Sequence, residues 1–206
     1  METKINLYGA SGHCKVIVDI LLANKVEIGT IIDDNPKLLS ILDHSVQKND
    51  HFYFDGDSHW IISIGNNKIR KMLSQKLPVL YGQAIHPSVN ISPYATIGKG
   101  TVVMAGVIIN PDVSVGSHSI INTGAIIEHD CKIEDFVHIC PGVSLAGDVT
   151  VGEGTQIGIG ATVIQGIKIG KWAFVGAGAV IINDVPDYAV VVGNPGRIIK
   201  FKEVNE

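Results

Sequence analysis

The chain has 206 residues, of which 46% are hydrophobic but only 6% aromatic, so small and branched aliphatic side chains must fill its core. The formal net charge of -4 supplies no basic field for a nucleic-acid backbone or an anionic membrane surface, so we expect neither partner. The three cysteines cannot pair evenly, and the first residues lack the pattern of a secretory signal. We therefore expect a reducing, cytoplasmic location.

In residues 1–82, short apolar runs alternate with amphipathic stretches. Strands are predicted over 5–8, 26–32 and 60–64, and helices over 13–24 and over a stretch that ends near 76. This alternation predicts a small Rossmann-like α/β domain, with a parallel sheet and helices on its faces. The polar segment 43–58 predicts loops or an edge hairpin. The histidines in and beside it lack the spacing of metal ligands, so we expect no metal there; they are His44, His51 and His59.

A glycine turn, Gly9-Ala10-Ser11-Gly12-His13, joins the first strand to the first helix. Free backbone N–H groups and the positive end of a helix favour a phosphate there, although a bare turn can have the same sequence. Asp33 and Asp34 follow the next strand, where a carboxylate either meets ribose or base donors or caps a polar turn. The spacing is not that of a dinucleotide site. Together the two features favour a nucleotide or a nucleotide sugar.

From residue 83 onward, every sixth residue is aliphatic: all seventeen such positions from Ile85 to Ile181 are Ile, Val or Leu. A period of six matches neither a helix nor an alternating strand. Three units form one triangular turn, so residues 83–206 predict a parallel β-helix of about five turns with the aliphatic residues inside. Glycine supplies the bends. Pro186 and Pro195 break the period, so we expect a short C-terminal helix or strand that caps the last coil.

The polar residues Glu128-His129-Asp130 lie in an outward-facing turn of the repeat, and the repeat itself does not require them. A neighbouring carboxylate raises the basicity of a histidine, which a general base needs, but a surface histidine is more often only solvated. Cys131 falls in the inward phase of small residues, so we expect it to pack and not to react. The glycines between 142 and 178 suit either tight bends or a long thin ligand lying along the backbone.

Several motifs together resemble the sialic acid O-acetyltransferase NeuD family of left-handed β-helix (hexapeptide repeat) acyltransferases, and within it especially the bacillosamine-pathway UDP-4-amino-sugar N-acetyltransferase. They are the hexapeptide array, Tyr-Gly-Ala-Ser-Gly-His from Tyr8, Ile-Asp-Asp ending at Asp34, Ile-Gly-Asn-Asn-x-Ile-Arg over 64–70, and Ile-Glu-His-Asp-Cys over 127–131. The sequence Val-Gly-Asn-Pro-Gly-Arg over 192–197 is similar to the closing motif of many hexapeptide acetyltransferases. The resemblance covers nearly the whole chain. It implies that the β-helix is left-handed and that acetyl-CoA is the co-substrate, without a metal.

The resemblance also implies roles for single residues. His129 matches the catalytic base, and Asp130 matches the acid that orients it, which is a glutamate in the bacillosamine-pathway enzyme. The residues implied to bind acetyl-CoA are His138 near the acetyl group, Gly147 at the thioester carbonyl, and Ile159 and Ala177 along the pantetheine arm. Ala177 replaces a glycine of that enzyme. The residues implied to bind the nucleotide sugar are Gly9, Ser11, Gly12, His13, Asp33 and Asp34.

We therefore expect an acetyl-CoA-dependent N-acetyltransferase that acts on the amino group of a nucleotide-linked sugar, a UDP-4-amino sugar first. The alternatives are O-acetylation of sialic acid, N-acetylation of a dTDP- or GDP-linked amino sugar, and, in a different class, a non-catalytic β-helix binding protein. The resemblance implies a homotrimer with sites at subunit interfaces. Outward-facing apolar residues need cover, which also favours a trimer; they are Val102, Ile108, Ile126 and Ile182.

Overall fold

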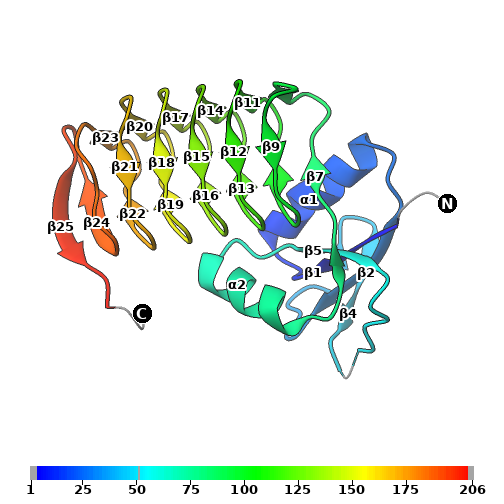
Figure 1. Ribbon diagram of the computed structural model, residues 1–206. Helices are drawn as coiled ribbons and strands as arrows, with labels where there is room; N and C mark the ends of the chain where they lie inside the picture. Colours follow the sequence, from blue (N-terminus) through cyan, green and yellow to red (C-terminus); the bar gives the residue numbers. More distant parts are fainter. Residues whose placement is uncertain (1–3, 51, 204–206) are drawn as a thin grey trace.

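The computed structural model describes residues 4–50 and 52–203 of the chain. His51 and the first three residues, which entered the metal and signal-sequence predictions, lie outside this range. Figure 1 shows a sheet with two helices at the N-terminal end (blue to blue-green), followed by a stack of coils that runs from green to red. An α/β region followed by a parallel β-helix is thus confirmed. Neither helix in the described residues is long and apolar enough to cross a membrane.

The N-terminal sheet has the strand order β3-β4-β2-β1-β5-β6. Neighbouring strands are parallel except β3 and β4, which form the expected edge hairpin. The hairpin begins at Ser40, before the polar segment that predicted it, and the buried Ile41 anchors it. The elements are β1 (Ile5–Tyr8), α1 (Gly12–Ala23), β2 (Ile28–Asp33), β3 (Ser40–Ile41), β4 (His44–Lys48), β5 (His59–Ile62), α2 (Asn67–Lys76) and β6 (Leu80–Tyr81).

The β-helix has three faces, and on each face neighbouring strands come from successive coils. The β7 face contains β7 (Ala84–Ile85), β10 (Val102–Val103), β13 (Ile120–Ile121), β16 (His138–Ile139), β19 (Gln156–Ile157) and β22 (Phe174–Val175). The β8 face contains β8 (Asn90–Ile91), β11 (Ile108–Ile109), β14 (Ile126–Ile127), β17 (Ser144–Leu145), β20 (Thr162–Val163) and β23 (Val180–Ile181). The β9 face contains β9 (Thr96–Ile97), β12 (Ser114–Val115), β15 (Lys132–Ile133), β18 (Thr150–Val151) and β21 (Lys168–Ile169). We name each corner by the face that it follows.

The period of six places the second residue of each short strand inside the coil. Ile121 pairs with Ile139, which pairs with Ile157, and all three are fully buried. The first residue of each strand points outward, as His138 and Gln156 do on the β7 face. Aliphatic side chains stacked in this way form one continuous core along the axis, which stabilises the stack by removing apolar surface from water.

Two further strands close the C-terminal end, as the broken period predicted. β24 (Ala189–Val192) extends the β7 face in parallel with β22, and β25 (Arg197–Phe201) pairs antiparallel with β24. The outermost strand thereby covers the hydrogen-bonding edge of the last full coil.

α1 joins the two parts of the chain. The buried side chains on one face of α1 are Cys14, Ile17, Val18, Ile20 and Leu21. They pack in one cluster with Leu7 of the sheet and with Val102 and Ile120 of the β7 face. We expected Val102 to need cover from another subunit, and this expectation is wrong because α1 covers it and leaves 1% of it exposed. Ile108 and Ile126 on the β8 face stay half-buried, and Ile182 is exposed.

Candidate active site

The loop between β1 and α1 lies at the carboxyl end of an inner parallel strand, where ligands bind in open sheets of this kind. Gly9 has a φ of +110°, and a Cβ there would lie 2.5 Å from Ile64 Cγ1, so the position requires glycine. Ser11 precedes α1, and its hydroxyl caps no helix N–H. A Cβ on Gly12 would meet nothing within 4 Å. The start of α1 is therefore open to a ligand.

Asp33 ends β2 and Asp34 follows it, and protein donors already bind both carboxylates. Ala10 N donates to Asp33 Oδ2 over 2.8 Å. Tyr8 Oη and Asn49 Nδ2 both donate to Asp34 Oδ1, over 2.6 and 2.7 Å. Burial and the contact with Asp34 raise the phenol pKa of Tyr8. Asp33 thus shapes the glycine loop, whereas Asp34 Oδ2 accepts no hydrogen bond within the described residues.

His13, at the start of α1, lies close to His138 at the start of β16. Within the described part of the chain, the buried His13 Nε2 has no hydrogen-bond partner. Burial, the charge of Arg70 and His138 lower the pKa of His13 to about 3. Burial and Arg70 lower the pKa of His138 to about 4. Both rings are therefore neutral at pH 7, and one residue predicted for the nucleotide sugar lies within charge-interaction range of one predicted for acetyl-CoA.

Asn122, on the neighbouring coil, fixes which nitrogen of His138 carries the proton. Its Nδ2 lies 3.1 Å from His138 Nε2, and its Oδ1 accepts a hydrogen bond from Thr123 N over 2.8 Å. The bond to Thr123 sets the orientation of the amide, so Nδ2 donates and Nε2 accepts. The proton of the neutral ring then lies on Nδ1, which can donate to a ligand.

Arg70 is a fully buried cation of α2 that holds the two parts of the chain together. Its Nε donates to His118 O over 2.6 Å, and Nη2 donates to Phe136 O over 3.1 Å; both carbonyls belong to the corner after the β9 face. Nη1 donates to Ile64 O and Gly65 O, beside the glycine loop. Burial lowers the pKa of Arg70 to about 9, so it stays charged at pH 7.

His129 lies at the corner after the β8 face, with 62% of its side chain exposed. Its Nδ1 is 2.6 Å from Asp130 Oδ2, so the aspartate makes the contact expected of the longer glutamate in the bacillosamine-pathway enzyme. This hydrogen bond, with the charges of Asp130 and Glu128, raises the pKa of His129. A Cβ on Gly147 would lie 2.7 Å from Cε1 and 2.8 Å from Nε2, so glycine on the next coil lets the ring lie against the backbone.

Ile159 and Ala177 lie together at the corner after the β7 face, on adjacent coils. Both side chains are exposed, and Gly178 N donates to Ile159 O over 2.8 Å.

Cys131 is buried, and its Sγ donates to Ala146 O over 3.2 Å. Burial raises its thiol pKa to about 11, which suits the packing role that its inward position predicted.

One chain does not bring all of these residues together. The glycine loop and Asp34 lie at the carboxyl ends of β1 and β2, and His13, at the start of α1, interacts with His138 of the β7 face. His129, Asp130 and Gly147 lie at the corner after the β8 face, which is opposite the β7 face in a triangular coil. The predicted base and the predicted acceptor site are therefore on different sides of the same chain.

The sequence singled out neither Arg70 nor Asn122 as part of a site. Arg70 stood within the motif that ends at residue 70, but nothing in the pattern shows that its side chain is buried. Asn122 follows the inward Ile121 in a position that the repeat leaves free. A polar residue directly after an inward aliphatic residue, next to an outward histidine one coil away, is the signal that could have found it.

Two sequence families match parts of this chain: the PglD N-terminal domain over residues 4–77, and the bacterial transferase hexapeptide (six repeats) over residues 148–183. The UDP-N-acetylbacillosamine N-acetyltransferase of Bacillus subtilis is 38% identical over 119 residues. That match covers 49% of this chain and 51% of the Bacillus protein, so the chain spans about half the length of this curated relative.

Two solved structures are similar over nearly the whole chain. A mutant of perosamine N-acetyltransferase from Caulobacter crescentus, in complex with CoA and GDP-perosamine, is 36% identical with a TM-score of 0.91, and the match covers 97% of this chain and 98% of that chain. The acetyltransferase domain of PglB from Neisseria gonorrhoeae, in complex with acetyl coenzyme A, is 32% identical with a TM-score of 0.90, over 97% of this chain and 100% of that chain.

Proposed function

Because this chain belongs to the family of hexapeptide-repeat sugar N-acetyltransferases that includes the perosamine and bacillosamine-pathway enzymes, we propose that it transfers the acetyl group of acetyl-CoA to the amino group of a nucleotide-linked sugar. The observation that carries the proposal is the contact of His129 Nδ1 with Asp130 Oδ2. Since Nδ1 is engaged by the carboxylate, Nε2 is the nitrogen left to accept a proton. A histidine held in this way serves as a general base.

The reaction needs one proton acceptor and one stabiliser of negative charge. The sugar amine attacks the thioester carbonyl carbon, and His129 Nε2 takes the amine proton. The tetrahedral intermediate then releases the CoA thiolate, which receives a proton from the histidinium. The Gly147 N–H, from the chain that supplies His129, and the Nδ1–H of neutral His138, from an adjoining copy of the chain, are the donors available to the oxyanion. These reaction steps form no covalent acyl-enzyme.

The glycine loop and Asp34 are assigned to the acceptor. The open start of α1 suits a phosphate, and Asp34 Oδ2 suits a hydroxyl or base N–H donor. The Bacillus relative is named for a UDP-linked sugar, and the Caulobacter relative binds a GDP-linked sugar. GDP is therefore a candidate beside the expected UDP. Ile159 and Ala177 are assigned to the pantetheine arm of acetyl-CoA.

The reaction is placed in the cytoplasm, where the three buried and unpaired cysteines stay reduced.

A homotrimer is proposed because one chain keeps the base and the acceptor site on different sides. In a closed ring of three copies, the corner after the β8 face of one copy can meet the β7 face of the next.

A mixture of His129→Ala and Asp34→Ala chains tests this arrangement. When three-chain assemblies form at random, about a quarter of the interface sites combine an intact His129 with an intact Asp34. Co-expressed chains should therefore regain activity at low acceptor concentration, whereas sites built within one chain would regain none.

The activity itself is tested by incubation of the protein with acetyl-CoA, a thiol reagent and a panel of acceptors. The panel contains UDP-, GDP- and dTDP-linked 4-amino sugars and sialic acid. Thiol release with one nucleotide amino sugar, together with an amide in the product, supports the proposal and names the substrate. Release with sialic acid alone would indicate O-acetylation. No release with any acceptor, from a protein that still binds CoA, would leave the non-catalytic alternative.

A further inference from the structure

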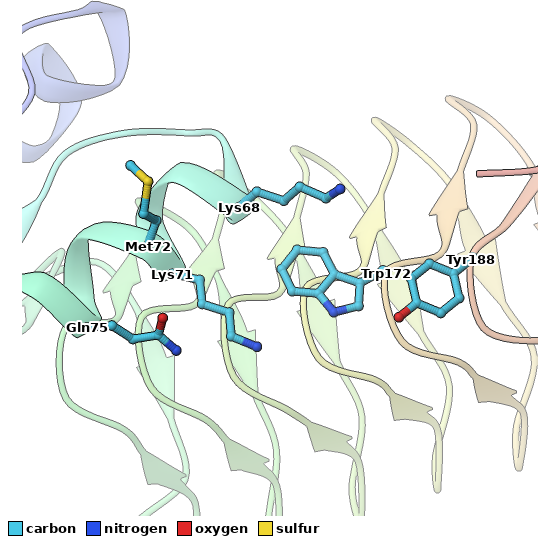
Figure 2. A pocket seen from close by; sticks show the side chains of 6 residues that line it. All are labelled: Lys68, Lys71, Met72, Gln75, Trp172 and Tyr188. Carbon is cyan, nitrogen blue, oxygen red and sulfur yellow. The ribbon is translucent and has the colours of Figure 1, made fainter. Parts of the chain in front are cut away.

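A concave surface of about 500 Å³ lies on the β7 face beside the start of α2. We call it the basic groove. The residues that define it are Lys68, Gln156, Trp172, Phe174, Lys200 and Lys202. Figure 2 shows a smaller adjoining pocket, in which Lys68 and Lys71 extend from α2 toward the indole of Trp172. None of the roles assigned above uses these residues.

In the basic groove, Lys202 lies close enough to Lys68 and to Lys200 for their charges to repel it. Burial lowers the pKa of Lys202, and the charges of Lys68 and Lys200 lower it further. Within residues 4–50 and 52–203, no carboxylate oxygen lies within 4.0 Å of any of the three ammonium groups. Lys71, one turn further along α2, does pair with a carboxylate, that of Glu153. An anionic ligand would relieve the repulsion in the groove, as Glu153 neutralises Lys71.

Aromatic rings hold two of the ammonium groups over the groove. Lys68 Nζ lies 6.0 Å from the ring centroid of Trp172, and Lys202 Nζ lies 5.5 Å from that of Phe174. Lys202 Nζ also donates to Trp172 O over 2.9 Å. An ammonium group has three N–H donors, and residues 4–50 and 52–203 engage one of those of Lys202, which leaves two for a ligand in this part of the chain. Cation–π contacts restrict the lysines without neutralising them.

The basic groove is next to the predicted chemistry. Gln156, in its floor, pairs with His138 on the adjacent strand of the β7 face. A substrate that reaches His138 with one end can therefore place another end in the groove. Phosphate is the anion that both proposed substrates carry, because CoA ends in adenosine 3′,5′-bisphosphate and the acceptor contains a nucleoside diphosphate.

We propose that the basic groove binds a phosphate group of one of the two substrates through Lys68, Lys200 and Lys202. This inference rests on the proposed function for the source of the phosphate. Titration calorimetry on the full chain tests it with adenosine 3′,5′-bisphosphate in one arm and with UDP and GDP in the other. The test variant is Lys68→Gln/Lys200→Gln/Lys202→Gln, with Lys68→Gln alone as a second variant in case the triple change impairs folding.

The groove variant should lose at least about tenfold in affinity for one of the two ligand classes, because each charge-assisted hydrogen bond contributes about a factor of ten. The class that weakens identifies the substrate that supplies the phosphate. Parent binding should also weaken as salt rises. The matched control, Lys99→Gln/Lys132→Gln/Lys168→Gln, removes the same charge from three exposed lysines outside the groove and should keep both affinities.

Equal affinities of the groove variant and the parent for both classes would overturn the proposal, and so would an equal loss in the control variant. The assay requires no turnover. A chain that binds these ligands through the groove but transfers no acetyl group would therefore contradict the proposed function and leave the phosphate site in place.

Discussion

The side chain of His129 is mostly exposed, and its ring is oriented by Asp130 and by the backbone at Gly147. His129→Ala should lower kcat by about 10²- to 10⁴-fold, because the amine then loses its proton to water alone. The KM for acetyl-CoA and the melting temperature should stay near those of the parent, since no buried group changes. Steady-state kinetics with saturating acetyl-CoA measure the effect. A kcat close to that of the parent would remove His129 from the mechanism and direct attention to His138.

The contact with Asp130 also sets the pH dependence. A general base works unprotonated, so kcat/KM falls as the pH falls through the pKa of His129. Asp130 raises that pKa above the ordinary histidine value of about 6.5, so the acidic limb of the parent should lie above this value. Asp130→Asn keeps a residue type that tolerates the positive φ of 63° but removes the charge. In this variant the acidic limb of the kcat/KM profile should move toward lower pH, and the plateau value of kcat/KM should fall. An unchanged limb would mean that another group controls the rate.

At the scale of the coil, glycines at the corners differ in what surrounds them. Gly154 and Gly160 have nearly the same left-handed φ, 69° and 64°. A Cβ on Gly154 would overlap the indole of Trp172, whereas a Cβ on Gly160 would meet nothing within 4 Å. Gly160→Ala should therefore reduce the free energy of unfolding by about 1–2 kcal/mol, the usual penalty for this conformation. Gly154→Ala should reduce it further. Chemical denaturation of both variants gives the difference, and equal losses would show that Trp172 moves aside freely.

α2 is attached to the β-helix through a cation without a carboxylate partner within the described residues. Arg70→Met should lower the free energy of unfolding by about 3 kcal/mol or more, because several buried carbonyl groups lose their donor. In the fraction that folds, the KM for the acceptor should rise more than the KM for acetyl-CoA, since Arg70 joins the loop at Ile64 to the coil that carries His138. Lys76→Met, an exposed position on the same helix, is the control. Equal changes in both KM values would contradict the positioning role.

At the scale of the whole molecule, the β8 face keeps half-buried apolar residues on its outer side. Sedimentation of the parent should give about three times the 22.0 kDa of one chain. Ile126→Asp places a charge on the β8 face and should shift the protein to single chains and abolish turnover, because His129 then has no neighbouring acceptor site. Thr96→Asp places the same charge on the β9 face and should keep both the mass and the rate. An active single chain would rule out the shared site.

The sequence predicted the architecture well because the six-residue period states directly which side chains are buried. It also identified the family, which the comparisons confirm. The pattern could not show what lies outside a coil: Val102 has the same phase as Ile126, yet α1 covers only Val102. In the same way, Asp33 and Asp34 are identical neighbours in sequence, and only the fold shows that Asp33 binds the loop while Asp34 Oδ2 accepts no hydrogen bond from the described residues. Their assigned roles stay predictions until the variants are measured.

The stacking of equal coils has a consequence for how such a chain changes in length over evolution. Each coil adds about 4.8 Å of height, so the loss or duplication of one whole coil leaves every other side chain pointing in its original direction. The loss of a single residue instead reverses the direction of the side chains that follow it in that stretch. Descendants of this protein should therefore vary in steps of entire coils. The gain or loss of a coil between Gly147 and Ala177 would lengthen or shorten the surface that is assigned to acetyl-CoA.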